Sequence, residues 1–353
     1  MCNFAKFALW FAVLACAQVA SAGEQDFNGR WDLIVHNNPT CTVTCAWWLE
    51  VTGAGTPALK ASFVGFSDGS LHDLPDVAIK DGVMHFAYDR PEGGGRGPAP
   101  GTQVAGGAAR GGGAPTGAAG AGAGRGPTPA QHIDYEIRYV NGKLDGRMIG
   151  GKNLTFTGER APTIDEHDDG TWVKGTPIVL FNGKDLTGWT GIRTENADGW
   201  TVENGILTSR GHADDLVTKA KYWNFELHAE YALEERSNSG IGLRGRYEVQ
   251  IASDYGRPPN MHGTGALYTR ILPAVNAGKP PGEWQTYDIR LVGMEVTAVL
   301  NGVKLYEKGV IDGLTGIAYD PYEGKPGSLE LQGDHGAVRF RNLVLTPLTK
   351  KGN

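Results

Sequence analysis

The sequence predicts an all-β protein in which a large β-sandwich of jelly-roll type follows a smaller β-rich domain. Short segments that alternate apolar and polar residues recur along the chain, Asn-Gly and Asp-Gly pairs separate many of them, and helical periodicity is nearly absent. A length of 353 residues suits two domains, at roughly 100 to 200 residues per domain. The hydrophobic share of 40% and the charged share of 20% exclude wholesale disorder and a protein with many membrane spans.

The first 22 residues have the pattern of a secretory signal peptide. Lys6 precedes an apolar stretch from Phe7 to Ala15, and Ala20-Ser21-Ala22 has the small-x-small form that signal peptidase cleaves. We therefore expect a periplasmic or secreted protein. A less favoured cut before Cys16 would leave a lipid anchor on that residue. No apolar stretch approaches the roughly 20 residues that span a bilayer, so we expect no membrane span.

The net charge limits the kinds of partner that we expect, and the cysteines indicate the redox state of the compartment. Removal of residues 1–22 takes away one positive charge, so the formal net charge of −6 becomes −6 − 1 = −7. A negative chain is a poor match for a phosphate backbone, and we expect no nucleic acid partner. Cys41 and Cys45 lie four residues apart in CTVTC, which predicts a local disulfide in an oxidising compartment, with two free thiols as the alternative.

Residues 23–163 are predicted to form the β-rich N-terminal domain, which we expect to be barrel-like. Its opening, Gly29-Arg30-Trp31, resembles that of small up-and-down β-barrels, which begin Gly-x-Trp. An insert at 91–129 interrupts the domain, and 15 of its 39 residues are glycine, which predicts a long flexible loop. The segments predicted as strands are Gly29–Val35, Ala46–Val51, Ala61–Gly65, Val83–Tyr88 and the hairpin Tyr135–Tyr139 and Leu144–Met148 around Asn141-Gly142.

A polar linker is expected at residues 164–176, between the two domains. Five consecutive acidic or histidine residues lie in it, and such a run is usually a solvated connection. Oxygen ligands of this kind can also hold a divalent cation, which is the alternative and the one cofactor that the sequence suggests. The residues are Asp165, Glu166, His167, Asp168 and Asp169.

Residues 177–348 are predicted to form the sandwich. Tight turns are expected at Asn204-Gly205, Asn301-Gly302 and Asp312-Gly313. Strands at this spacing over about 170 residues are typical of a two-sheet jelly roll. The predicted strands are 200–202, 206–208, 225–232, 246–251, 284–292, 296–300, 329–332 and 338–345.

One nucleotide-binding pattern in this region is a false positive. Gly240 to Gly245 satisfies G-x-G-x-x-G, but a dinucleotide site needs this loop to open a helix, and here it leads into an alternating strand ending at Ile251. No P-loop, H-E-x-x-H, Cys-Cys zinc spacing or G-x-S-x-G elbow occurs. The common hydrolase and metalloprotease signatures are therefore absent from the sequence.

The strongest candidate for a site is a polar row on that strand. Period-2 alternation places Arg244, Arg246, Glu248 and Gln250 on one face and apolar residues on the other. A solvated sheet face is the plain alternative. Grouping a carboxylate with two guanidiniums and an amide is costly unless a ligand binds them, so we favour a binding face.

Further polar and aromatic residues are expected around this row. Asn238 precedes the strand in a turn, and Glu330, Gln332 and His335 form a similar polar run near the C-terminus. Tyr268 and Trp284 are candidates to border the face. Polar sheets edged by aromatic rings suit sugars, whose hydroxyl groups need hydrogen-bond partners and whose apolar faces stack on rings.

At these residues the chain resembles the 3-keto-disaccharide hydrolase family, whose members are also described as 3-keto-glucoside lyase/hydratases. The likeness covers about 170 residues, from 177 to 348, with the blocks in the expected order. Residues 24–165 are not covered, and Gln285 stands where the family usually has Asn. The blocks are VLFNGKDLTGW (179–189), NFELHAEY (224–231), NSGIGLR (238–244), YEVQI (247–251), TGALY (264–268), GEWQTYDI (282–289), LNG (300–302) and ELQGDHGAVRFRNL (330–343).

The resemblance implies a concanavalin-A-like sandwich that acts on glycosides already oxidised at C3, such as 3-keto-glucosides and 3-keto-disaccharides. A ketone at C3 acidifies the C2 proton, so a general base can remove it while the C1 substituent leaves by β-elimination, and water can add afterwards. Glu248 or His335 is the expected base. Arg244, Asn238 and Gln250 are candidates to stabilise the enolate oxygen.

Tyr268, Trp284 and Gln332 are expected to bind the sugar, which is the small-molecule partner that this interpretation requires. A different class of function stays open at this point. The same face on the same fold could serve a non-catalytic, lectin-like carbohydrate-binding protein, because a fold alone does not decide function.

Overall fold

The computed structural model describes residues 23–38, 45–66, 69–90 and 131–351. The predicted signal peptide, the glycine-rich insert and the side chains of the predicted Cys41–Cys45 disulfide lie outside the described residues. The all-β prediction is confirmed, since the regular structure that is described consists of strands and one short 3-10 turn, η1 (Glu24–Phe27). No helix in the described ranges is long and apolar enough to cross a membrane.

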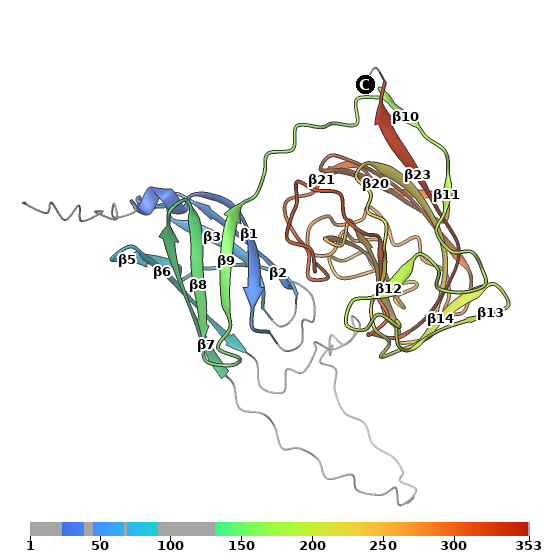
Figure 1. The fold of residues 1–353 in the computed structure, drawn as a ribbon, viewed down its shortest axis with the longest axis horizontal. Coiled ribbons are helices and arrows are strands. Elements are labelled where there is room, and N and C mark those ends of the chain that lie inside the picture. The colour runs from blue at the N-terminus through green and yellow to red at the C-terminus, as the bar shows by residue number, and fades with distance from the viewer. Residues whose placement is uncertain (1–22, 39–44, 67–68, 91–130, 352–353) are drawn as a thin grey trace, which may run out of the picture.

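The first nine strands form one curled sheet, which we call the N-terminal barrel (Figure 1). Its order is β4-β3-β2-β1-β9-β8-β7-β6-β5, an antiparallel meander in which β1 also pairs with β9. The strands are β1 (Gly29–His36), β2 (Cys45–Thr52), β3 (Lys60–Val64), β4 (Leu71–Asp73), β5 (Ala78–Lys80), β6 (Val83–Arg90), β7 (Gln131–Val140), β8 (Lys143–Ile149) and β9 (Thr155–Arg160).

Turn chemistry and alternation explain the barrel. Asn141 and Gly142 both have positive φ, at 52° and 85°, which is the geometry of a type I′ hairpin turn, so the predicted hairpin between β7 and β8 is confirmed. Burial alternates strictly along β8, with Leu144 and Met148 pointing inward. The inner face is packed with aromatic rings, among them Phe63 and Tyr135.

The remaining strands form a sandwich of two antiparallel sheets. The larger sheet has the order β13-β14-β23-β16-β19-β20-β21, with β10 and β11 paired to β23, and the smaller has the order β12-β15-β22-β17-β18. The strands are β10 (Trp172–Lys174), β11 (Ile178–Val179), β12 (Trp189–Gly191), β13 (Trp200–Glu203), β14 (Ile206–Arg210), β15 (Leu216–Thr218), β16 (Phe225–Leu233), β17 (Asn238–Leu243), β18 (Tyr247–Ala252), β19 (Gln285–Val292), β20 (Glu295–Leu300), β21 (Val303–Val310), β22 (Glu330–Leu331) and β23 (Ala337–Lys350).

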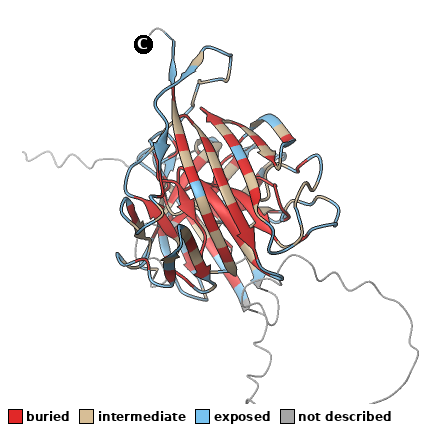
Figure 2. Cartoon of the chain, turned by 90° about the vertical axis from the view of Figure 1, so that its right-hand side faces the viewer, coloured by how far each residue is buried: buried red, intermediate tan, exposed pale blue. Residues whose placement is uncertain are grey.

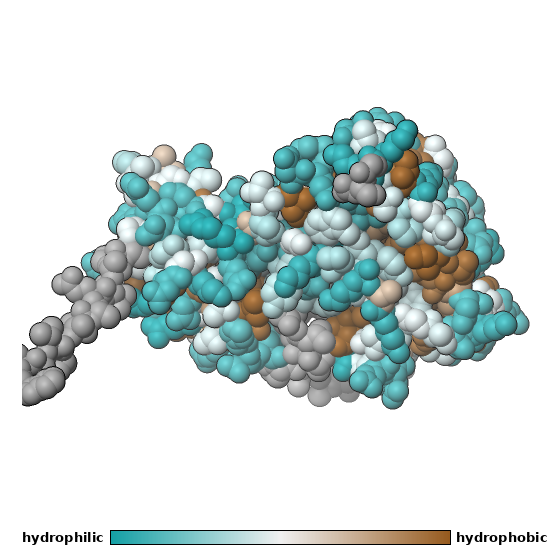
Figure 3. All heavy atoms as spheres, turned by 45° about the horizontal axis from the view of Figure 1, so that its top comes forward, coloured by the Kyte–Doolittle hydropathy of each residue, from teal (hydrophilic) through white to brown (hydrophobic). Residues whose placement is uncertain are grey.

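The sandwich core lies between the two sheets. The larger sheet contributes fully buried residues such as Tyr287 and Phe340, and the smaller sheet contributes Ile241 and Val249. Figure 2 shows the resulting bands of buried and less buried residues across the strands. On the face drawn in Figure 3 most surface residues are hydrophilic and apolar residues form separate patches.

The barrel packs directly on the sandwich through the outward face of β2. Trp48 is fully buried in the sandwich core cluster, and the Arg270 guanidinium lies 4.6 Å from the centre of its ring. Gly313 makes this contact possible, because a Cβ there would lie 2.2 Å from the Trp48 ring. At Asp312-Gly313, where a tight turn was predicted, the chain bends at Gly313, which has a φ of 86°, and the next strand after β21 is β22.

The acidic linker is bound to the sandwich by its side chains. Asp168 accepts two hydrogen bonds of 2.8 Å from Arg290, and Glu166 accepts bonds from Trp223 and Asn224. The ring of His167 contacts Glu295 at 2.8 Å. These partners are protein groups, and within the described residues no group of three or more His, Cys, Asp or Glu is arranged to hold a metal ion.

Candidate active site

The five-stranded sheet has one apolar face and one polar face. In its register, Val217 pairs with Glu330, Glu330 with Gly242, and Gly242 with Glu248. Residues paired on adjacent strands point to the same side of a sheet, so these four residues form one row. Ile241 and its partners point the opposite way, into the sandwich core.

A second row lies two positions further along the strands. Gly240 pairs with Gln250, and the backbone N–H of Gln332 donates a 3.0 Å hydrogen bond to the carbonyl of Gly240. Asp215 comes two residues before Val217 and therefore points to the same side. We call this side, with Asp215, Glu248 and Glu330, the carboxylate face.

Two glycines of β17 make room for the carboxyl groups. A Cβ at Gly240 would lie 2.4 Å from Oε1 of Glu248, and one at Gly242 would lie 2.6 Å from Oε2 of Glu330. The two side chains therefore lie across β17 at positions that only glycine leaves open. Gly240 and Gly242, which belong to the false nucleotide-binding pattern of the sequence, therefore lie beneath the two carboxyl groups.

Burial and mutual repulsion raise the pKa values of the three carboxyl groups. Burial first, and then the charges of Asp215 and Asp334, raise the pKa of Glu248 to about 8. Burial and the neighbouring carboxylates hold the pKa of Glu330 well above its usual range. Burial and the charge of Asp334 raise the pKa of Asp215 to about 6, although a hydrogen bond from the Gly333 N–H opposes the shift.

Residues from the segment between β21 and β22 cover part of the carboxylate face. The Thr315 hydroxyl accepts a 3.0 Å hydrogen bond from the Glu248 N–H, and the Tyr319 ring lies where a Cβ of Gly245 would be. Glu330 is completely buried, and neither of its carboxyl oxygens has a hydrogen-bond partner among the described residues. The side-chain oxygen of Gln332 is also buried and has no hydrogen-bond partner among the described residues.

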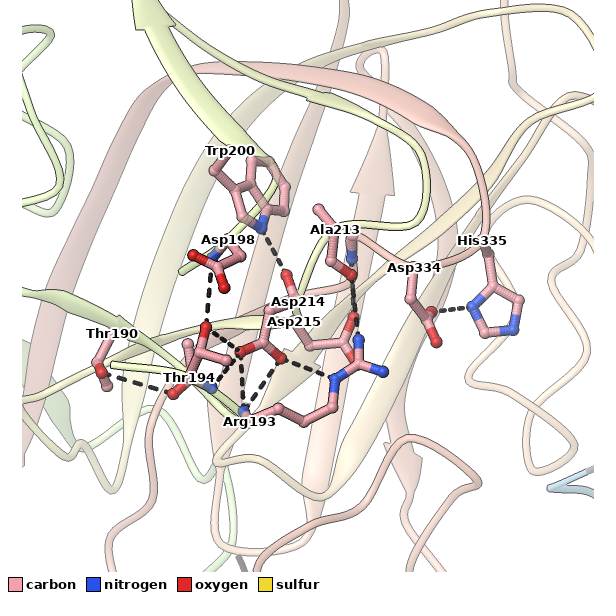
Figure 4. Close-up of polar contacts among 12 residues, drawn as sticks. Thr190, Arg193, Thr194, Asp198, Trp200, Ala213, Asp214, Asp215, Asp334 and His335 are labelled. Carbon is pink, nitrogen blue, oxygen red and sulfur yellow. Dashed lines mark hydrogen bonds and ion pairs between the residues drawn. The ribbon is translucent and has the colours of Figure 1, made fainter. Parts of the chain in front are cut away.

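The accessible rim of the face is formed by Asp334, His335 and Arg193 (Figure 4). Nδ1 of His335 contacts the Asp334 carboxylate, and the His335 side chain is 37% exposed. Burial opposes the charge on Arg193, but the hydrogen bond and charge of Asp214, and then the charges of Asp215 and Asp334, raise the pKa of Arg193. The rim therefore brings a cation and an imidazole to the edge of the buried carboxyl groups.

The buried carboxylate of Asp214 holds Arg193 in place. That carboxylate accepts hydrogen bonds from the backbone N–H groups of Arg193 and Thr194, at 2.8 and 2.7 Å, and from Nε of Arg193 at 3.1 Å. Trp200 donates a 2.6 Å bond to the Asp214 carbonyl. A guanidinium held in this way is pre-organised, because little side-chain entropy is left to lose when an anion binds.

The structure does not place Arg244 on the carboxylate face, where the sequence analysis expected it. Its guanidinium is buried and donates to the carbonyls of Trp223 and Gly293, at 2.8 and 2.9 Å, and to Oδ1 of Asn224 at 3.0 Å. It also lies 3.7 Å from the centre of the Trp223 ring. Arg244 has a φ of 56° and belongs to a turn, so strand alternation does not reach it.

The Arg246 guanidinium also binds protein groups away from Glu248. It lies just before β18 and donates to the carbonyls of Asp320 and Lys325, at 3.2 and 2.8 Å, beside an ion pair with the Asp320 carboxylate. The predicted cluster of two guanidiniums around Glu248 is therefore absent. No guanidinium charge therefore opposes the effects of burial, Asp215 and Asp334, which raise the pKa of Glu248.

Gln250 and Trp284, two of the predicted site residues, make contacts within the protein. Gln250 donates to the His262 carbonyl at 3.2 Å and accepts from the Ile251 N–H at 3.0 Å, so its amide is already used. Trp284 lies by the larger sheet, where the Arg341 guanidinium sits 3.9 Å from the centre of its ring. Trp284 therefore lies beside β23 of the larger sheet, and not on the smaller sheet that carries the carboxylate face.

The other predicted residues lie on or near the carboxylate face. Asn238 begins β17 on the same side as Gly240 and is half-buried. Tyr268 is half-buried, its N–H donates to the Glu248 carbonyl at 2.9 Å, and its ring packs on His262. Gln332, His335 and Glu248 lie on the face or at its rim, as described above.

The sequence interpretation missed Asp215, Asp214 and Arg193, and it assigned no role to Asp334. The available signal was the pair Asp214-Asp215 directly before an apolar strand, Leu216-Val217, because consecutive acids at a strand end point to opposite sides. Arg193 lies in a loop and carries no pattern of its own. Only pairing of β15 with β22 brings these residues beside Glu330.

Gln285, where the sequence departs from the family pattern, is buried beneath a loop. Its Oε1 accepts from the Lys279 N–H at 2.8 Å and from Asn301 at 3.3 Å. The departure therefore concerns a loop contact and not the carboxylate face.

Solved structures with similarity to the chain include two of a proposed glycosyl hydrolase from Parabacteroides distasonis. One is 27% identical and covers 49% of this chain and 94% of its own, with a TM-score of 0.43. The other is 30% identical and covers 53% of this chain and 92% of its own, also with a TM-score of 0.43.

Among curated proteins, a 3-keto-disaccharide hydrolase from Bacteroides thetaiotaomicron is 32% identical over 74 residues, which is 18% of this chain and 26% of that protein. The chain thus matches about a quarter of the length of this relative. Residues 176–346 match the model of the 3-keto-alpha-glucoside-1,2-lyase-like domain family. The expected resemblance to this family is confirmed over these residues, which form the sandwich.

Proposed function

We propose that the protein cleaves 3-keto-glycosides on its carboxylate face by elimination at C1 and C2. The observation that carries this proposal is the set of three carboxyl groups with raised pKa values on one glycine-floored sheet face. Carboxyl groups that titrate near neutral pH are suited to move protons. The family match supports a carbohydrate as the substrate.

Asp215 and Glu248 divide the acid and base roles. Asp215, with a pKa of about 6, is ionised at neutral pH and takes the C2 proton. The C1–O bond then breaks, a C1=C2 double bond forms, and Glu248, with a pKa of about 8, gives its proton to the departing oxygen. Water adds across the double bond afterwards, so the net result is hydrolysis. This division replaces the expectation that Glu248 or His335 is the base.

Arg193 and His335 stabilise the charge that develops on the C3 oxygen. Both lie at the accessible rim, and Arg193 is fixed there by Asp214. Cationic groups aimed at a developing enolate lower the barrier most when they need no reorganisation. Arg193 thus takes the role that the sequence assigned to Arg244.

The width of the face fits a sugar lying across the strands. β15 and β18 are separated by β22 and β17, so their backbones are about 14 Å apart at roughly 4.8 Å per strand. The Glu248 side chain leans back over Gly240 and shortens this span. A pyranose ring between Asp215 and Glu248 can therefore present C2 to one and the C1 oxygen to the other.

The direct test is incubation of the purified protein with 3-keto-trehalose and with a 3-keto-β-glucoside, beside the same sugars without oxidation. Mass spectrometry follows the released alcohol and the unsaturated keto intermediate. We expect cleavage of the keto forms only, and uptake of one deuterium at C2 when the reaction runs in D₂O. Saturable binding of the keto sugars without cleavage would instead favour the lectin-like alternative.

A further inference from the structure

A cavity of about 310 Å³ opens at one end of the N-terminal barrel. It lies where β1, β3, β6 and β8 end and where β2 and β7 begin. Its volume falls at the lower end of the range of small-molecule sites, which is roughly 300 to 1,000 Å³. None of its lining residues belongs to the carboxylate face. Its largest side chains are Trp47, Phe66, Tyr88, Ile133, Tyr135 and Met148.

Aromatic rings form part of the cavity wall, at Trp47, Phe66, Tyr88 and Tyr135. Phe66 and Tyr88 are stacked, with ring centres 4.0 Å apart and planes at 11°. Trp47 meets Tyr135 edge to face, with ring centres 6.1 Å apart. The fixed rings present both faces and edges, and aromatic ligands prefer stacked or edge-to-face contacts with such rings.

Glycines keep the cavity open. Gly65 lines it, and a Cβ there would lie 2.8 Å from the Trp47 ring and 2.4 Å from that of Phe63. Gly69 and Gly316, which face each other across the barrel–sandwich contact, also line it. The sandwich therefore completes one wall, through Gly316 and Ala318.

Among the described residues that line the cavity, Lys152 is the one that carries a charge. Its ammonium group lies 3.4 Å from Oδ1 of Asn38, which also lines the cavity. Apart from these two, the lining residues that the structure describes are apolar, aromatic or glycine. A bound molecule would meet aromatic rings and aliphatic groups, and a positive charge at one place, which favours an anion over a cation of the same shape.

We propose that this cavity binds one small, flat aromatic molecule that carries a carboxylate or another acidic group. The rings hold the aromatic body, and Lys152 interacts with the acidic group. The site is independent of the carboxylate face, and the proposal does not depend on cleavage of 3-keto-glycosides.

The test uses 2-naphthoate as the probe and the full chain by isothermal titration calorimetry. We expect saturable binding with one site per chain and at least about tenfold weaker binding of 2-naphthylmethylammonium, a difference of about 1.4 kcal/mol. Ala318→Phe should fill the cavity from the sandwich wall and lower the affinity for 2-naphthoate at least about tenfold, by the same measure. Ala220→Phe, at an exposed site outside the cavity, is the matched control and should bind as the parent does.

A second readout keeps the test decisive if Ala318→Phe does not fold. With ¹³C-methyl methionine, 2-naphthoate should shift the Met148 signal, which Met148→Leu identifies, and leave those of Met261 and Met294 in place. Absence of saturable binding, equal affinity of the folded Ala318→Phe variant, or shifts away from Met148 would each overturn the proposal. Glu248→Gln should bind the probe unchanged, which separates this site from the carboxylate face.

Discussion

At the scale of single residues, burial beside other carboxylates determines the protonation state of Glu248. A carboxyl group that loses water and gains no cation keeps its proton to higher pH. Arg244 and Arg246 would have reversed this effect, but their guanidiniums bind backbone carbonyls instead. The residue that the sequence placed among cations is therefore an acid near neutral pH.

We expect Glu248→Gln to lower kcat/KM for a 3-keto-glucoside at least about 100-fold, the usual contribution of general acid–base catalysis. The amide keeps the shape of the side chain and removes the proton that leaves with the C1 oxygen. Thermal unfolding should show that the variant is at least as stable as the parent, because a buried carboxyl group is lost. An unchanged rate would exclude Glu248 from the reaction.

The pH dependence of kcat/KM should be bell-shaped, with limbs near pH 6 and pH 8. The acid limb reports protonation of Asp215, whose pKa is raised to about 6, and the alkaline limb reports loss of the proton from Glu248, whose pKa is raised to about 8. Because the two groups interact, the limbs belong to the pair. Steady-state rates from pH 4 to pH 10 measure this profile. Asp215→Asn lacks the base and should have so little activity that no acid limb is seen.

Arg244 and Arg193 should respond in opposite ways to replacement by lysine. Arg244→Lys leaves buried carbonyls without donors and should lower the free energy of unfolding by about 1–3 kcal/mol, while kcat/KM of the folded protein stays the same. Arg193→Lys should lower kcat/KM and change stability by less than about 1 kcal/mol, since its side chain is partly exposed. Denaturant titration and initial rates measure both, and a catalytic loss confined to Arg244→Lys would restore the sequence prediction.

At the scale of secondary structure, the glycines of strand β17 leave room for side chains from the neighbouring strands. Glycine in a strand interior weakens it and often marks a close approach of another group. Here the groups that approach are the carboxyl ends of Glu248 and Glu330. The same glycines that lower the stability of β17 thus make room for the carboxyl groups of the site.

We expect Gly240→Ala to reduce kcat/KM by at least about tenfold and as much as 100-fold, the cost of a 1 Å misplacement of a reacting group. The added methyl group would occupy the position of the Glu248 carboxyl, which would have to move. Circular dichroism should show an unchanged sheet content. Gly175→Ala in the linker is the control, since its nearest contact would be the Pro347 carbonyl at 3.3 Å.

At the scale of the whole molecule, a buried pair of carboxyl groups joins the barrel to the sandwich. Asp32 lies on β1 and Glu323 on the segment that precedes β22, and Tyr247 donates a 2.8 Å hydrogen bond to Glu323. Burial, then the charge of Glu323 and a hydrogen bond with it, raise the pKa of Asp32 to about 9, against the effect of Arg246. The contact between the two parts therefore holds a proton at neutral pH.

This pair should make the parent protein less stable as pH rises. The folded pKa of Asp32 lies above the unfolded one, so its contribution is fully present below about pH 4 and is lost as pH rises through about 9. Between pH 6 and pH 9 the Tm of the parent should therefore fall by several degrees more than that of Asp32→Asn, at about 2–4 °C per kcal/mol. Calorimetry at both pH values measures this, and equal slopes would contradict it.

Much of the architecture follows from local sequence. Asn-Gly turns, alternation and the absence of helical periodicity are properties of neighbouring residues, and they were enough to predict an all-β chain and a sandwich. Glu248 and the polar run at Glu330 and Gln332 were found for the same reason, because alternation within one strand decides which side a residue faces.

The composition of the site was decided only by the tertiary structure. Asp215, Glu330 and Glu248 come together because β15, β22, β17 and β18 pair side by side, although more than 110 residues separate the first of them from the second. Arg244 was misplaced because a turn with positive φ ends the alternation before it reaches that residue. Strand pairing and burial act between distant segments, and these long-range effects determine which carboxyl groups keep their protons.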